Sequence, residues 1–509
     1  MTTLRRLEIS AVLLILLVGV IGALVFFLTF KYLGAVPKKI IPLIRYVQAE
    51  KTLDQIWPSV TDLATIGDVN RQIFESLVRY DSESRIEPLL ATSWSRADDT
   101  RWIFHLRSGV KFHNGHALTP TIARDSLLAT INNPALDQYT STIAGIEAPA
   151  STDEVVIDTT VADPTLPDKL AYLLIFDPTA TKKNDSANGT GPYQVKPGTA
   201  PTADHIRLSA IDDYYGKYQW VREIDITAGA DQVVDAYRSG RIDIGPVSFQ
   251  DKVDGRGYNL LQSRPLANWI LLPNTRRADL PLVSADARRA VAMAIDPNAL
   301  INGAGLAGSP ATQLLAAGVP GYVSGLNRPT GTAAKIKQLL AGAGFGVGSG
   351  GGDLPLMTLK LAYAPDQSTV AALVKSQLTA AGISVDLAPA SDDVTFAIAL
   401  GAGTADLYLT SAATQYLDGA DIFKSVLRSN LYVNPTIDDQ IAALGVTFDT
   451  PGRVALLQKI ETAAADDCAV IPLYTPAAGL FVVDPSYRMF KDVPGPGLGV
   501  YFQTVYTDR

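Results

Sequence analysis

The sequence predicts an α/β fold of two lobes, preceded by one N-terminal transmembrane helix. A chain of 509 residues is too long to fold around a single core, so two or three domains are expected. Strand–helix–strand patterns occur at residues 223–245 and again at residues 357–388. This order is typical of α/β lobes with a mainly open sheet. An apolar run near the N-terminus, residues 9–30, predicts the membrane segment.

The transmembrane prediction depends on the length of that run, Ile9–Phe30, which contains no charged residue. At about 1.5 Å per residue, a helix of this length crosses a hydrocarbon core of roughly 30 Å. The apolar core of a cleaved signal peptide is shorter, so an uncleaved anchor is favoured, and cleavage after Ala35 stays an alternative. Basic residues lie on both sides of the run, so their charge leaves the orientation open. Residues 1–36 are assigned to this anchor or signal.

Charge and cysteine content exclude several classes of function. The net charge is −8, and the sequence shows no cluster of Lys and Arg that would bind nucleic acid phosphates. Cys468 is the only cysteine, which excludes an internal disulfide and a site built from several thiolates. We expect Cys468 to be buried as a small apolar residue.

The first lobe begins with a predicted strand at 45–49 and an irregular stretch at 53–67. An amphipathic helix is predicted at 69–78 from its apolar face, and a half-buried strand at 100–107 from its alternation of apolar and polar residues. Thr119 and Pro120 predict the start of a helix that ends at Ala129. The remaining predictions for this lobe are a hairpin at 147–161, helices at 166–171 and 231–239, and strands at 193–196, 205–210, 223–228 and 241–245.

The second lobe is predicted from residue 268 onward. Its predicted strands are 268–274, 357–363, 384–388 and 405–410, and its predicted helices are 286–295, 334–341, 368–381 and 452–465. The run at 470–483 is expected to lead back to the first lobe, and residues 501–506 to add a strand to the first lobe's sheet.

Several motifs carry a family resemblance. They are FESLVRYD at 74–81, PLLATSW at 88–94, FHLRSGVKFHNGHALT at 104–119, NGTGPY at 188–193 and the arginine-alanine helix at 286–295. In these stretches the chain resembles the peptide-type (family 5) extracytoplasmic solute-binding proteins of ABC importers. The chain has no cysteine near its N-terminus and so departs from the many relatives that are anchored by a lipid-modified cysteine.

The resemblance implies a periplasmic-binding-protein-like fold of type II, with an extra subdomain in the first lobe. It places lobe I at 37–267, with an inserted subdomain at about 76–186, lobe II at 268–478, and the return to lobe I at 479–509. The chain would then cross twice between the lobes, and such a hinge suits closure around a ligand. The resemblance also implies an extracytoplasmic, monomeric protein that works with an ABC permease.

No sequence motif predicts catalysis, a cofactor or a metal site. His113 and His116 lie in a turn without further ligands, whereas catalytic zinc needs three protein ligands. The run Gly303–Gly308 matches the dinucleotide fingerprint, but it follows a predicted helix and not a strand. Trp94 and Trp102 lie in strand-like runs and are expected to anchor a core.

In the relatives, the segment after the 405–410 strand binds an extended peptide through backbone hydrogen bonds, and an acidic side chain pairs with the peptide's α-amine. This resemblance makes Ala412, Ala413, Thr414, Gln415, Tyr416 and Asp418 candidate ligand-binding residues. The acid is expected near Gln415 or Tyr416, and uncharged Gln415 cannot compensate a buried ammonium, whose desolvation costs several kcal/mol. Either Asp418 takes the role, or the ligand has no free amine there. The alternative for Asp418 is capping of a helix start.

Two further places complete the predicted site. The loop with Thr65, Ile66 and Gly67 is expected to approach the ligand because the corresponding loop does so in relatives. Trp269 lies at the crossing between the lobes, where an aromatic ring could pack on a ligand.

The predicted function is therefore capture of peptides in an interlobe cleft and their delivery to a membrane permease, without catalysis. The departure at Gln415 supports an alternative, in which the same fold binds a nickel chelate, haem or an oligosaccharide. A tethered sensor or scaffold with an unused cleft is the third hypothesis.

Overall fold

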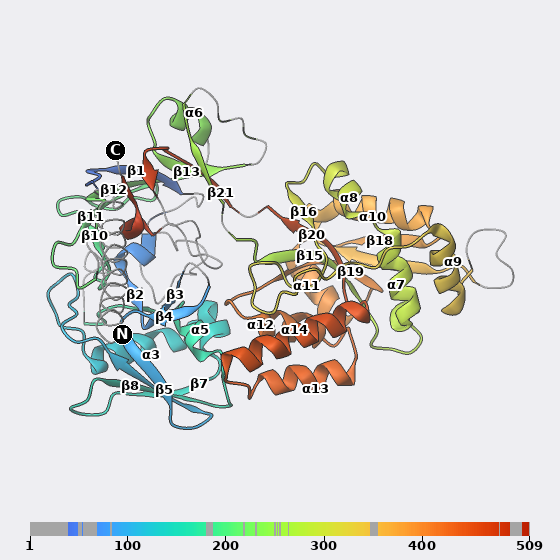
Figure 1. Cartoon of the computed structure of the whole chain (residues 1–509), viewed down its shortest axis with the longest axis horizontal. Helices are drawn as coiled ribbons and strands as arrows, with labels where there is room; N and C mark the ends of the chain where they lie inside the picture. The colour runs from blue at the N-terminus through green and yellow to red at the C-terminus, as the bar shows by residue number, and fades with distance from the viewer. Residues whose placement is uncertain are drawn as a thin grey trace, which may run out of the picture.

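The structure, a computed structural model (Figure 1), describes residues 39–48, 53, 69–81, 84–179, 187–216, 219–229, 232–248, 251, 253, 256–262, 264–346, 355–477, 479–488 and 501–507. The predicted membrane segment at 9–30 and the predicted ligand residues Thr65, Ile66 and Gly67 lie outside this set. Among the helices that the structure describes, none combines the length and the apolar character needed to cross a membrane.

A seven-stranded mixed sheet organises the first lobe, in the order β10-β11-β12-β1-β13-β21-β14. The opening strand β1 lies in its centre and runs parallel to β12 and β13, with Ile44 opposite Ile224 and Tyr46 opposite Ile244. β21 comes from the C-terminal part of the chain and pairs with both β13 and β14. The strands are β1 (Ile44–Gln48), β10 (Tyr193–Val195), β11 (His205–Ala210), β12 (Glu223–Ala228), β13 (Ile244–Val247), β14 (Asn259–Gln262) and β21 (Leu480–Val483).

A separate four-stranded antiparallel sheet, in the order β5-β6-β8-β7, forms the lower part of this lobe in Figure 1. The alternation predicted at 100–107 appears in β6, whose Trp102, Phe104 and Leu106 are buried. Helix α3 (Pro120–Ile131) begins as predicted, because the Thr119 side chain accepts a hydrogen bond from the Ile122 backbone N–H. The strands are β5 (Ala91–Arg96), β6 (Arg101–Leu106), β7 (Ile143–Glu147) and β8 (Glu154–Thr159).

Two short strand pairs and three helices also belong to this lobe. β2 (Glu75–Ser76) pairs with β9 (Leu174–Ile175), and β3 (Val78–Tyr80) pairs with β4 (Ile86–Pro88). The helices are α4 (Asp137–Thr140), α5 (Leu166–Leu170) and α6 (Val233–Arg238).

The second lobe contains a six-stranded sheet in the order β16-β20-β15-β19-β17-β18. Its central strand β15 is buried on both faces: Leu271 packs into one core and Ile270 and Leu272 into another, as the alternation of a strand requires. The strands are β15 (Ala267–Pro273), β16 (Gly308–Pro310), β17 (Thr358–Tyr363), β18 (Ser384–Pro389), β19 (Leu407–Ala413) and β20 (Ile471–Pro476).

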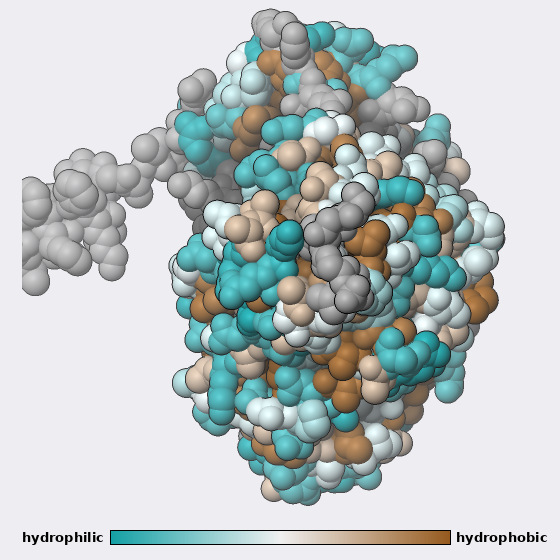
Figure 2. Space-filling view, turned by 90° about the vertical axis from the view of Figure 1, so that its right-hand side faces the viewer, coloured by the Kyte–Doolittle hydropathy of each residue, from teal (hydrophilic) through white to brown (hydrophobic). Residues whose placement is uncertain are grey.

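Helices cover the two faces of this sheet. Residues of α7 (Ala285–Ala294), α8 (Pro297–Gly303), α9 (Ala333–Gly342) and α10 (Ser368–Ala380) pack into the core that contains Leu271. The opposite core receives α12 (Gly419–Ile422), α13 (Pro435–Leu444) and α14 (Thr450–Asp466), with α11 (Asp393–Ala402) at its margin. Figure 2 shows the outer end of this lobe, where hydrophobic residues interrupt a largely hydrophilic surface in several separate places, as is normal for a surface in water.

The chain crosses between the lobes twice, from β14 to β15 and from β20 to β21, and Figure 1 shows these crossings close together. The crossing strands are neighbours within each sheet, since β15 pairs with β20 and β14 with β21. The two lobes are therefore joined by two adjacent connections, which is the arrangement of a hinge.

Two predicted elements are wrong. The helix predicted at 69–78 ends at Ile73. Residues 75–76 and 78–80 form β2 and β3 instead, because pairing with β9 and β4 satisfies their backbone groups. Residues 501–506 do not join the main sheet. Phe502–Thr504 is a short 3₁₀ helix, and β23 (Tyr506–Thr507) pairs with β22 (Tyr487–Arg488) in a small separate ladder.

Candidate functional site

The predicted ligand segment lies where the second lobe's sheet meets the crossing. β17, β18 and β19 run parallel, and Tyr363 at the end of β17 pairs with Pro389 and Leu409. β19 continues to Ala413, which lies opposite Ala267 at the start of β15. The carboxyl ends of parallel strands are the usual place for a ligand in open α/β sheets. The candidate site is therefore at the interlobe end of the sheet.

One edge of β19 is open at this end. β15 pairs with all of β19, but β17 pairs only with Leu407–Leu409. Within the described residues, Thr410–Ala413 thus have a strand on one side only. Ser411 and Ala413 are exposed there, whereas Ala412 is buried. An open strand edge can accept an extended peptide by main-chain hydrogen bonds.

The residues that follow β19 hold the two lobes together. Tyr416 and Leu417 are buried in the core of the first lobe, although they belong to the second. The Tyr139 hydroxyl donates to the Gln415 carbonyl oxygen at 3.3 Å, and the Leu417 N–H donates to the Tyr80 hydroxyl at 3.2 Å. Tyr416 therefore contributes to the contact between the lobes and not to an open wall of the site.

Asp418 is fully engaged inside the protein. Arg453 Nε and Nη2 donate to its two carboxylate oxygens at 2.7 and 2.9 Å, and the Ala420 N–H donates at 2.7 Å. The side chain is almost fully buried, and it caps helix α12. This geometry favours the capping role over the pairing of Asp418 with a ligand amine.

A different carboxylate lies beside Gln415. The Gln415 N–H donates to Asp421 Oδ2 at 2.7 Å, and the Gln415 side chain is exposed. Burial raises the pKa of Asp421, and the nearby Asp418 charge raises it further. The sequence pattern indicates only a helix start at Asp421, because no local signal shows that this side chain folds back onto Gln415.

Trp269 and Thr414 have partners of their own. The Trp269 ring stacks on Tyr474 with a centroid distance of 6.1 Å and an interplanar angle of 14°, and it stays half-buried. The Thr414 hydroxyl donates to the Tyr416 carbonyl oxygen, and Thr414 is buried. Of the predicted ligand residues that the structure describes, Gln415, Ala413 and the outer part of Trp269 are accessible.

The sequence motifs of the first lobe meet at one point, next to the helix that ends at Ile73. A Cβ atom on Gly189 would lie 1.9 Å from the Ile73 carbonyl oxygen, so only glycine fits there. Thr190 donates to Glu75 Oε2 at 2.9 Å, and the His113 ring lies 2.9 Å from the Gly191 carbonyl oxygen through Nε2. The NGTGPY, FESL and HNGH runs therefore support one another structurally.

Glu75 lies at the centre of this junction and is buried. Tyr214 and Tyr215 donate to its Oε1 atom at 2.5 and 2.9 Å. Burial raises the pKa of Glu75 to about 7, although the three hydroxyl donors oppose this shift. Burial lowers the pKa of His113, which favours a neutral ring. His116 instead pairs with Asp177 at 2.8 Å, and no group of three or more metal-ligating side chains occurs among the described residues.

The polar side chains of Gln48 and Asn70 were missed by sequence reasoning. Both are buried, and within the described part of the chain neither has a hydrogen-bond partner for its amide nitrogen or oxygen. Asn70 follows closely after the predicted ligand residues Thr65, Ile66 and Gly67. Buried amides without partners are typical of sites that bind water or a ligand.

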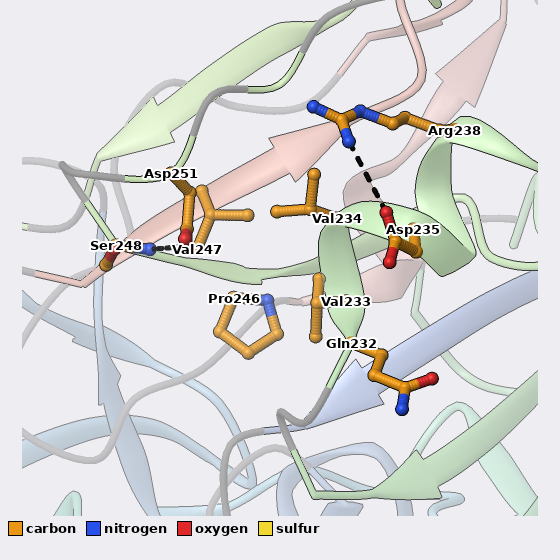
Figure 3. Close-up of a pocket in the computed structure, with 9 residues that line it drawn as sticks. All are labelled: Gln232, Val233, Val234, Asp235, Arg238, Pro246, Val247, Ser248 and Asp251. Carbon is orange, nitrogen blue, oxygen red and sulfur yellow. Dashed lines mark hydrogen bonds and ion pairs between the residues drawn. The ribbon is translucent and has the colours of Figure 1, made fainter.

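A hollow with a volume of about 560 Å³ lies elsewhere, at α6 and β13 (Figure 3). Val233, Val234 and Pro246 point into it, while the charged side chains around it have partners of their own. Asp251 accepts from the Ser248 N–H at 2.6 Å, and Arg238 pairs with Asp235 at 3.4 Å. None of the predicted ligand residues lines this hollow.

Comparison with known proteins identifies similar chains. The family of bacterial extracellular solute-binding proteins, family 5 (middle region), matches residues 85–432. The nickel-binding protein NikA of Staphylococcus aureus is 25% identical over 397 residues, which cover 74% of this chain and 78% of that protein.

Solved structures with the same fold include two peptide binders. The unliganded open form of MppA, a periplasmic murein tripeptide binding protein, has a TM-score of 0.79 at 17% identity and covers 92% of this chain and 98% of its own. DppA from Helicobacter pylori in complex with the peptide STSA has a TM-score of 0.65 at 17% identity, with 92% and 99% covered.

Proposed function

The chain belongs to the family 5 bacterial extracellular solute-binding proteins, and from this premise we propose that it captures peptides between its lobes and delivers them to an ABC permease. Proteins of this family are transport binding proteins, and they are located outside the cytoplasm. No covalent chemistry is part of the proposal. That the solute is a peptide goes beyond membership of the family. The observation that supports a peptide is the open edge of β19.

The open edge supports a peptide because an extended chain offers N–H and C=O groups at the spacing of a strand. The unpaired side of Thr410–Ala413 lies at the interlobe end of the sheet. Asp421, beside Gln415, supplies a carboxylate for the peptide's α-amine in place of the occupied Asp418. Thr65, Ile66, Gly67 and Trp269 stay predicted contacts in this proposal.

A nickel chelate is the second candidate ligand. The similarity to nickel-binding proteins extends over most of the chain, with the Staphylococcus aureus protein as one case. Uncharged Gln415 stands where peptide binders need an acid, which weakens the case for a free amine at that place. The chelate would bring its own metal ligands, so the protein would not need three metal-ligating side chains.

A thermal-shift and calorimetry panel tests the proposal. The ligands are trialanine, nickel with two equivalents of L-histidine, haemin and maltotriose. We expect trialanine to raise the melting temperature, and Asp421→Asn to weaken its binding at least tenfold because a charge-assisted hydrogen bond is lost. The control is Asp438→Asn, on helix α13, which should leave trialanine affinity unchanged.

The other outcomes of this panel are informative. Stabilisation by nickel–histidine alone would transfer the proposal to a chelate, and stabilisation by haemin or maltotriose alone to that ligand. Indifference to all four would contradict capture of peptides and support a tethered sensor or scaffold with an unused cleft.

Membrane attachment is a separate part of the proposal. We propose that residues 1–36 hold the protein on the outer face of the membrane, where a monomer can reach its permease. A variant in which a cleavable secretion signal replaces residues 1–36 is expected to move from the membrane fraction into the extracytoplasmic fluid. An unchanged membrane fraction would contradict the anchor.

A further inference from the structure

Arg71 is a buried cation with no acidic partner among the described residues. It lies on the short helix before β2 and is only 6% exposed. Its Nη1 atom donates to the Ala171 carbonyl oxygen at 3.3 Å. Nε and Nη2 have no hydrogen-bond partner in the described part of the chain, and no ion pair involves Arg71 there.

Burial of the Arg71 guanidinium without a charged partner is unfavourable in free energy. The guanidinium stays charged in proteins, and the penalty for burying an uncompensated ion is several kcal/mol. Nε and Nη2 lie on one edge of the guanidinium plane, where their two N–H bonds match the two oxygens of a carboxylate. A carboxylate is therefore the group that best satisfies this edge.

The acidic groups near Arg71 are engaged by other partners. Arg71, Arg79, Ser76 and Tyr501 line a small cavity of about 10 Å³ that also borders Glu75. Arg79 is compensated by Glu87, with Nε 2.6 Å from Oε1. Glu75 uses its oxygens for Thr190, Tyr214 and Tyr215, and burial favours its neutral form. A volume of about 10 Å³ is close to the space for a single water molecule. An anionic group enters this cavity only if the side chains that line it move apart.

The cavity is close to the site between the lobes. The Arg71 guanidinium lies 5.5 Å from the centre of the Tyr172 ring, and the buried Tyr172 hydroxyl has no partner in the described residues. Tyr172 stacks on Tyr139 at a centroid distance of 4.9 Å, and Tyr139 donates to the carbonyl oxygen of Gln415. Two stacked rings therefore connect Arg71 to the second-lobe segment of the candidate site.

We propose that Arg71 binds a carboxylate group through Nε and Nη2, and that the solute captured by this protein is a carboxylate-bearing one. The proposal rests on the proposed function and specifies its ligand. The carboxylate has two possible sources, a free small acid or the terminus of a larger solute such as a peptide.

The test compares Arg71→Met and Arg71→Lys with the wild type. The probes are sodium acetate, trialanine and trialanine amide, each measured by calorimetry and thermal shift at constant ionic strength. We expect Arg71→Met to weaken trialanine binding about ten- to hundredfold, as for the loss of a hydrogen-bonded charge. Arg71→Lys keeps the positive charge but not the pair of parallel N–H donors, so it should recover part of the affinity. Trialanine amide should bind the wild type and Arg71→Met equally weakly.

Arg328→Met is the matched control. Arg328 is a half-buried arginine of the second lobe whose Nη1 and Nη2 atoms donate to backbone carbonyl oxygens and whose Nε lacks a partner in the described part of the chain. Its replacement should leave the affinity for trialanine unchanged.

The source of the carboxylate follows from the acetate arm. Stabilisation by acetate that Arg71→Met abolishes indicates a site for free small acids, and stabilisation by trialanine alone indicates the terminus of a solute. Equal trialanine affinity in wild type and Arg71→Met overturns the carboxylate site and leaves the proposed function standing. Wild-type protein that binds none of the three probes overturns the carboxylate site and contradicts peptide capture as well.

Discussion

Two carboxylates close together in the chain have different roles because their surroundings differ. Asp418 is enclosed by the Arg453 guanidinium and a backbone N–H, so its charge is already compensated. Asp421 receives one backbone N–H from Gln415, and burial raises its pKa. Lys424 and Lys169 lie near enough to oppose this shift, but within the described residues Asp421 forms no ion pair. An incoming ammonium would therefore gain more from Asp421 than from Asp418.

Asp168, at the contact between the lobes, gives a testable pH dependence. Burial and the neighbouring Asp418 charge raise its pKa from 3.8 to about 7, and the Tyr80 hydroxyl donates to it at 3.0 Å. Between about pH 4 and pH 7, the Asp168 carboxyl is therefore protonated in the folded protein and ionised in the unfolded chain. Its contribution to the free energy of unfolding is lost as the pH rises from about 4 to about 7.

We expect Asp168→Asn to reduce the fall in stability between pH 5 and pH 7 by roughly 1 to 2 kcal/mol, since one pKa unit corresponds to about 1.4 kcal/mol. Urea denaturation at each pH measures this difference. Glu75 and Glu461, whose pKa values burial also raises to about 7, act equally in both proteins and cancel. Parallel pH profiles of wild type and variant would contradict the prediction.

At the scale of elements, the close approach of the NGTGPY turn to the end of the 69–73 helix determines how the first lobe is assembled. Gly189 and Gly191 lie against the carbonyl oxygens of Ile73 and Gln72, and the Gly191 N–H donates to the Ile73 carbonyl oxygen at 2.8 Å. The helix ends there because its last carbonyl groups are used by another segment. The following residues are then available for β2.

Gly189→Ala is expected to destabilise the first lobe by about 3 kcal/mol, because the new methyl group would overlap the Ile73 carbonyl oxygen and force the backbone apart. Gly145→Ala, in β7, is the matched control, since no atom lies within 4 Å of the place that its Cβ atom would take. The control should change the free energy of unfolding by less than about 0.5 kcal/mol. Chemical denaturation measures both, and equal values would contradict the argument.

The elements that the sequence predicts well are those with local signals. β6 has its alternating side chains and α3 its threonine cap and first-turn proline, so both appear as expected. The helix predicted at 69–78 is wrong in its second half. Leu77 and Val78 fit the apolar face of a helix and both are buried, but Val78 lies in β3, which pairs with β4. Helix α11, with Val394 and Ile398 exposed, was missed because its apolar pattern resembles a buried run.

The site was predicted less completely than the fold. The position of Ala412 and Ala413 follows from the strand before them, and the Gln415 side chain is exposed. Their contact with a ligand stays a prediction. Asp418 pairs with Arg453, which is 35 residues away in the chain, and Asp421 accepts a hydrogen bond from the backbone N–H of Gln415. Such pairings depend on tertiary packing, so no local pattern shows them.

At the scale of the whole molecule, the two lobes are joined by two adjacent crossings and by a contact from Tyr80 and Tyr139 to residues 415–417. Phe448 adds to this contact, because its ring centre lies 6.0 Å from that of Trp102 and 3.5 Å from the Arg96 guanidinium. The family and its two-lobed α/β fold were predicted correctly from the motifs. The residue limits 37–267, 268–478 and 479–509 stay predictions.

Closure of the lobes gives a prediction at this scale. Saturating trialanine should reduce the radius of gyration in X-ray scattering, because hinged lobes close around a bound solute. N-acetyl-trialanine amide, which has neither terminal charge, is the control and should leave the curve unchanged. Identical curves with and without trialanine, despite binding by calorimetry, would contradict closure.

Tyr416 and Leu417 have a practical consequence for building chimaeras of this family. Both are encoded with the second half of the chain, yet their side chains complete the interior of the first. A recombinant that exchanged the second half for that of a distant relative would therefore import two foreign residues into the recipient's hydrophobic centre. Breakpoints on either side of these two positions, with the pair retained from the recipient, would keep that centre native.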